Sequence, residues 1–89
     1  MNANQQWQVK LSATEIDGVT HAEARFALTD QTTLAGHGTA RLNPADRDVT
    51  AIGEEIAVAR ALSDLANKVL HSAASGIEEM THERAHLHM

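Results

Sequence analysis

The sequence has no cysteine and no tyrosine, and only one tryptophan, one phenylalanine and one proline among 89 residues. Without cysteine, the chain has neither disulfides nor a thiolate metal site. Because Trp7 and Phe26 are its only aromatic residues, the core must be built from aliphatic side chains and alanine. A chain this short buries roughly 60% of its unfolded surface, so such a core is thin, and association with a second copy is a natural remedy.

Long apolar runs and an excess of positive charge are also missing. No apolar stretch approaches the ~18 residues of a membrane span, and the N-terminal MNANQQWQVK lacks an apolar signal core. We therefore expect a cytoplasmic protein with no membrane association. The formal net charge of −5 argues against bulk electrostatic binding to nucleic acid, although it does not exclude a local basic patch.

Two alternating segments around Asp17-Gly18 predict a β-hairpin. Apolar and polar side chains alternate through residues 7–14 and 21–28, which is typical of half-buried strands. Asp-Gly favours a two-residue type I′ loop, which pairs Ile16 with Val19. A one-residue slip would break every apolar pair that this register creates. Those pairs are Ala13–Ala22, Leu11–Ala24, Val9–Phe26 and Trp7–Leu28.

A third strand is predicted over residues 33–42, followed by an Asn43-Pro44-Ala45-Asp46 turn. Its apolar face carries Leu34, Gly36, Gly38, Ala40 and Leu42. To align this face with the second strand, the connecting loop must have an odd number of residues, and Asp30-Gln31-Thr32 supplies three. Both glycines then lie on the inner face, where a helix can approach the sheet closely.

From residue 54 the apolar period becomes helical, and we predict a connecting loop over 47–53 and a helix over 54–74. Glu54 and Glu55 suit the positive end of the helix dipole, and Gly76 marks the end of the helix. The apolar stripe is wider than one sheet face requires. Either alanine is tolerated on the surface, or the helix makes a second contact, most simply with another protomer.

The order β-β-β-α predicts one α+β domain over residues 1–89, a three-stranded antiparallel meander with one long helix on one face. We expect a loose N-terminus over residues 1–5. We also expect a short helical turn over 77–82 and, over 83–89, a tail or a short edge strand.

Motifs that would indicate an enzyme are scarce. Gly36-His37-Gly38 is too short for a dinucleotide fingerprint and precedes no helix. His82, His86 and His88 could collect a transition metal, but a solvated tail is the simpler interpretation. We therefore assign no catalytic residue, metal site, cofactor or small-molecule substrate, and a small hydrolase or metal-dependent enzyme is the least favoured class.

The outer face of the predicted sheet is more informative, because it gathers basic side chains. The hairpin register places Lys10 opposite Arg25. If Leu28 pairs with Leu34, Arg25 faces His37 and a second row joins Thr14, His21 and Arg41, with Glu23 between the rows. This face is either a solvated surface or a site for phosphates or acidic partner residues. The candidate binding residues are Lys10, His21, Arg25, His37 and Arg41.

The segments GHGTARLNPADRDV, IGEEIAVARALSDLANKVL and IEEMTH resemble a family of small actinobacterial proteins of unknown function. Some of its members are associated with dormancy and the low-oxygen response. The matching pattern runs from residue 36 to residue 82. The resemblance implies a fold similar to the double-stranded-RNA-binding domain, and dimers similar to ribosome hibernation promoting factors.

These observations lead to one functional hypothesis and one alternative. The first is a non-enzymatic stress or dormancy protein, a homodimer, that binds the ribosome or RNA in the manner of hibernation factors. The alternative is a protein–protein interaction module without RNA contact, which uses the helix stripe or the tail.

Overall fold

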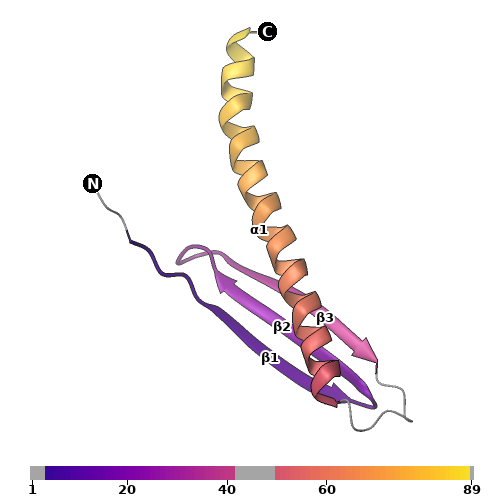
Figure 1. The fold of residues 1–89 in the computed structure, drawn as a ribbon. Helices are drawn as coiled ribbons and strands as arrows, with labels where there is room; N and C mark the ends of the chain where they lie inside the picture. Colours follow the sequence, from indigo (N-terminus) through magenta and orange to yellow (C-terminus); the bar gives the residue numbers. More distant parts are fainter. Residues whose placement is uncertain (1–3, 42–49, 89) are drawn as a thin grey trace.

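A computed structural model describes residues 4–41 and 50–88, with side chains described for 4–41 and 51–80. Three antiparallel strands form a sheet in the order β1 (Val9–Ile16), β2 (Val19–Ala27) and β3 (Thr33–Arg41), and one helix follows, α1 (Thr50–His88). The helix crosses one face of the sheet and projects beyond it (Figure 1). The predicted α+β arrangement is confirmed. The predicted turn at residues 43–46 lies outside the described residues.

The first hairpin has the register that its sequence predicts. Ile16 pairs with Val19, and the apolar pairs from Val9–Phe26 to Ala13–Ala22 all form. Asp17 and Gly18 have φ angles of 52° and 76°, as a type I′ turn requires. The fourth predicted pair, Trp7–Leu28, lies beyond the strand ends. There, the Trp7 ring packs on Phe26 with the ring centroids 5.3 Å apart.

The β2–β3 connection is longer than predicted. Strand pairing ends at Ala27–Thr33, so the loop has five residues, 28–32, and the predicted three-residue loop is wrong. Thr29 favours the longer loop, because its hydroxyl accepts the N–H of Gln31 at 3.2 Å and that of Thr32 at 3.0 Å. Both lengths are odd, so every side chain of β3 stays on its predicted face while its partners shift by two residues.

The helix is longer than predicted at both ends. It begins at Thr50 and continues to His88. Four predictions are therefore wrong where the structure describes them: the connecting loop over 47–53, the helix start at Glu54, the helix end near Ala74, and the tail or edge strand over 83–89. A glycine inside a helix costs only about 1 kcal/mol. Gly76 therefore does not stop a helix whose neighbouring residues favour it.

The core lies between α1 and strands β2 and β3. Its buried apolar residues are five alanines with Phe26 and Leu65, namely Ala22, Ala24, Phe26, Ala40, Ala57, Ala61 and Leu65. Side chains added at Gly36 and Gly38 would meet the backbone of α1, so the predicted close approach is confirmed. Every residue of β1 remains exposed. No described helix is long and apolar enough to cross a membrane.

Candidate functional site

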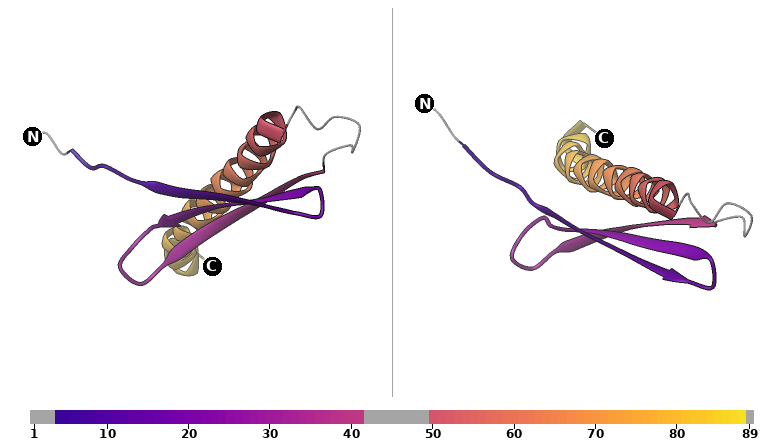
Figure 2. Two further views of the ribbon diagram at one scale, coloured as in Figure 1. Left: turned by 90° about the horizontal axis from the view of Figure 1, so that it is seen from below. Right: turned by 60° about the horizontal axis from the view of Figure 1, so that its bottom comes forward.

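The outer face of the sheet, opposite α1, carries all five residues predicted as a binding site. Lys10, His21, Arg25, His37 and Arg41 are exposed and alternate with the residues that face the helix. Figure 2 shows α1 on one side of the sheet only, and no described part of the chain covers the other side. The prediction of a shared face is therefore confirmed.

The predicted rows across that face are partly wrong. Lys10 does lie opposite Arg25. Arg25, however, faces Ala35 rather than His37, and Arg41 faces Val19 rather than His21. The two-residue shift that accompanies the longer loop explains both differences. The structure therefore brings Lys10 and Arg25 together and leaves Arg41 at the far end of the sheet.

Glu23 now lies among the basic residues, directly opposite His37. Its carboxylate is 3.0 Å from Arg25 Nε and 4.0 Å from His37 Nδ1. All three side chains are partly exposed, so these contacts contribute little to stability. Their consequence is electrostatic, because one negative charge divides the basic patch.

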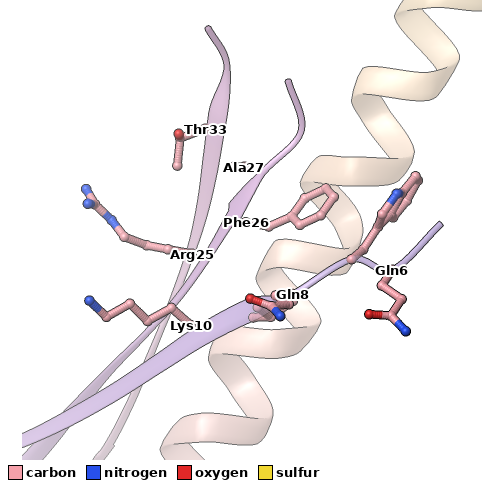
Figure 3. Close-up of a pocket in the computed structure, with 9 residues that line it drawn as sticks. Gln6, Gln8, Lys10, Arg25, Phe26, Ala27 and Thr33 are labelled. Carbon is pink, nitrogen blue, oxygen red and sulfur yellow. The ribbon is translucent and has the colours of Figure 1, made fainter. Parts of the chain in front are cut away.

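Lys10 and Arg25 also line an open hollow of about 660 Å³ at the end of the hairpin. Their side chains extend side by side in Figure 3, whereas Phe26 points toward the helix. Gln8 belongs to the same hollow and adds an amide. With Gln6, which also lines the hollow, this arrangement provides adjacent cations and two amides, and therefore suits an anion held at the surface.

The described part of the chain contains few side chains placed for metal binding or acid–base chemistry. No three His, Asp or Glu side chains there are grouped to hold a metal ion. The predicted alternatives for His82, His86 and His88 concern side chains outside the described set. One carboxyl has a shifted pKa: the backbone N–H of His37, followed by the Lys68 ammonium, lowers the pKa of Asp64 from 3.8.

The helix-facing side of the sheet presents a second surface, which includes part of the helix stripe that the sequence offered as an alternative site for a partner. An apolar groove of about 480 Å³ lies between β1 and the middle of α1, lined by Trp7, Val9, Phe26, Leu62, Leu65, Ala66, Val69, Leu70 and Ala73. Trp7 is 67% exposed and Leu70 is 69% exposed. The over-wide stripe of the helix was the signal for this groove, but its partner strand was not identifiable without the position of α1.

The free edge of β3 is occupied by side chains of α1. The Arg60 guanidinium donates to the Thr39 carbonyl at 2.7 Å, and Lys68 Nζ donates to the Ala35 carbonyl at 2.7 Å. Between them, Asp64 accepts the His37 N–H at 2.9 Å. The sequence predicted no contact for these three helix residues. Because Arg60, Asp64 and Lys68 are four residues apart, they lie on one face of the helix. That this face meets the edge of β3 could be inferred only from the direction in which α1 crosses the strand.

Comparisons with known proteins agree with this architecture. The Rv2632c-like family model matches residues 5–86. The uncharacterized protein Mb1767 of Mycobacterium bovis is 48% identical over 93% of this chain and 87% of its own. The uncharacterized protein Rv2632c of Mycobacterium tuberculosis is 45% identical over 85% of this chain and 81% of its own. A crystal structure of Rv2632c is similar, with 42% identity and a TM-score of 0.84 over 91% of this chain and 95% of the other.

Proposed function

This chain belongs to the Rv2632c-like family, and from that premise we propose that it is a non-enzymatic protein–protein interaction module. Its working surface is the apolar groove between β1 and α1. The single observation that carries this proposal is the exposure of Trp7 and Leu70 on either side of an almost wholly apolar hollow. Contiguous apolar surface rimmed by polar residues marks interaction sites in soluble proteins.

The chemistry of the groove supports contact rather than catalysis. Its lining consists of aromatic, aliphatic and alanine side chains, which supply no acid, base or nucleophile. Exposed aromatic and large aliphatic residues are the side chains that contribute most to the centre of a protein interface. The middle of α1 forms one side of the groove, and Val9 of β1, Phe26 of β2 and Trp7, which precedes β1, form the other.

Site-specific photo-cross-linking in cells tests the proposal. A photoreactive side chain in place of Leu70 should give discrete protein adducts, and a second substitution, Leu62→Glu, should abolish them by placing a charge in the groove. The matched control carries the same reactive group at Thr39, on the outer face. No discrete adduct from position 70, or equal adducts from both positions, would refute the groove as the working surface.

The outer face supports a second candidate function, which is binding to the ribosome or to RNA. Lys10 and Arg25 lie adjacent and exposed, with Arg41 and two histidines on the same uncovered face. Phosphate contacts of this kind weaken steeply with salt. The family resemblance extends this candidate to a dimeric, hibernation-like role in stress or dormancy.

Sedimentation with ribosomal subunits at two salt concentrations tests the second candidate. Charge reversal at Arg25 and Arg41 should abolish co-sedimentation at low salt, while circular dichroism remains that of the folded wild type because both side chains are exposed. Unchanged binding by the folded, charge-reversed protein would remove the outer face from consideration.

A further inference from the structure

The hollow at the end of the hairpin has polar side chains around a small alanine. Lys10 of β1 lies opposite Arg25 of β2, and Ala27, two residues further along β2, lies opposite Thr33 of β3. Pairing of β1 with β2 ends one residue before Ala27, and Gln8 lines the hollow on that side. Because Ala27 contributes only a methyl group, it leaves room between the longer polar side chains.

All three strands direct hydrogen-bond donors to this hollow. In Figure 3, the side chains of Lys10, Arg25 and Thr33 extend to the same side of the sheet, and all three line the hollow together with Gln8. They supply an ammonium, a guanidinium, a hydroxyl and an amide. Lysine and arginine carry donors but no acceptor. The two charged groups therefore require a ligand that accepts hydrogen bonds.

The charges around the hollow are only partly balanced within the chain. Lys10 and Arg25 are like charges directly opposite each other, which destabilises a sheet. The Glu23 carboxylate lies 3.0 Å from Arg25 Nε, so this ion pair engages one edge of the guanidinium. Among the side chains that the structure describes, no ion pair includes Lys10. An anion held between Lys10 and Arg25 would offset their repulsion.

We propose that the hollow binds the phosphate monoester group of a small polyhydroxylated molecule, such as a sugar phosphate. A phosphate monoester carries a charge of about −1.5 to −2 at pH 7 and has three acceptor oxygens, which matches Lys10 and Arg25. Gln8 and Thr33 both donate and accept hydrogen bonds, and so suit the hydroxyl groups of the attached sugar. The volume of about 660 Å³ lies in the range of small-molecule sites.

A single dianionic group fits this face better than a nucleic-acid backbone does. The row of side chains next to the Lys10–Arg25 pair is centred on Glu23, so a chain of phosphates that continued across the sheet would meet a carboxylate. Arg41 lies at the opposite end of β3 from Thr33. The formal net charge of −5 adds no long-range attraction for a polyanion. The site is also independent of the apolar groove, which lies on the helix-facing side.

Titration of the full chain with glucose 6-phosphate or ribose 5-phosphate, followed by amide NMR spectra, tests the proposal. We expect saturable shifts at the residues of the hollow, and none with glucose. Lys10→Gln should weaken binding by roughly tenfold or more, as expected when a charge-assisted hydrogen bond is lost. Ala27→Leu should also weaken it, because the larger side chain fills the hollow while every charge remains. Arg41→Gln is the matched control, since it removes a positive charge from the same face outside the hollow, and it should bind as wild type does.

The three substituted side chains are exposed, so each variant should keep the circular dichroism of wild type, and weaker binding then reports on the site. No saturable shift with either sugar phosphate would overturn the proposal. Equal affinity for inorganic sulfate would overturn the role of the sugar, and equal weakening by Lys10→Gln and Arg41→Gln would overturn the hollow in favour of net charge. Tighter binding of a 5′-hydroxyl oligoribonucleotide that Lys10→Gln abolishes would assign the hollow to the phosphodiester backbone of RNA instead.

Discussion

At the scale of single residues, two glycines determine how closely α1 lies on the sheet. A Cβ at Gly36 would meet the backbone of Ala61 and Leu65, and one at Gly38 would meet that of Ala57 and Ala61. Backbone cannot move aside as a flexible side chain can. This contact was predictable, because the alternating pattern places both glycines on the apolar face and so beneath a covering helix.

The variant Gly38→Val should therefore be destabilised by at least about 1–3 kcal/mol through overpacking. Gly76→Ala is the matched control, because a Cβ at Gly76 meets nothing within 4 Å. Alanine there should instead stabilise the helix by roughly 0.5–1 kcal/mol. Thermal unfolding followed by circular dichroism distinguishes the two effects. A Gly38→Val midpoint within a degree of wild type would contradict the packing.

Asp64 makes a small part of the stability depend on pH. Its carboxylate accepts the His37 N–H and pairs with Lys68, and these partners hold its pKa below 3.8. A group whose pKa is lowered by folding stabilises the folded state above its unfolded pKa, and this contribution is lost as pH falls through the folded pKa. Asp64→Asn should therefore differ from wild type in urea midpoint at pH 6, and the two should converge as the pH falls through the folded pKa of Asp64. Asp30→Asn, in the exposed β2–β3 loop, is the control, and a pH-independent difference for Asp64→Asn would contradict the argument.

At the scale of elements, local signals predicted some features well and left others open. Asp17-Gly18 and the flanking alternation determine one register, so the hairpin was predictable residue by residue. The β2–β3 loop was constrained only in parity, so three and five residues were equally consistent with the pattern. The helix end was mispredicted because one glycine is a weak stop signal, and its true start precedes the first strongly periodic residue.

The bonds between α1 and β3 predict an aggregation phenotype. Arg60→Ala combined with Lys68→Ala removes the donors to the Thr39 and Ala35 carbonyls. Two of the three backbone groups that α1 bonds on the β3 edge then become available for pairing, while Asp64 keeps the His37 N–H. We expect the double variant to form higher oligomers that light scattering detects as concentration rises. Asn67→Ala, an exposed change on the same helix, should behave as wild type. A double variant that keeps the wild-type mass would show that these side chains do not protect the edge.

At the scale of the whole molecule, composition predicted a thin core and the structure shows how thin it is. Among the residues whose burial the structure describes, five of the seven buried apolar residues are alanines, and each contributes little apolar area. The large apolar side chains, including Trp7, Leu11, Leu62 and Leu70, are instead exposed. The sequence predicted the wide apolar stripe of the helix, but not which of the large apolar side chains are buried and which are exposed. The amount of apolar surface left uncovered depends on where α1 crosses the sheet.

This distribution predicts that stability depends on protein concentration. If folding and association of two copies are linked, the thermal midpoint should rise with concentration, since mass action favours the associated folded state. A tenfold increase supplies about 1.4 kcal/mol, which for a pair of this total length corresponds to a rise of roughly 3–5 °C. Calorimetry over a hundredfold range of concentration measures the slope. A wild-type midpoint that is constant over that range would mean that the exposed apolar residues do not stabilise the fold through a second copy.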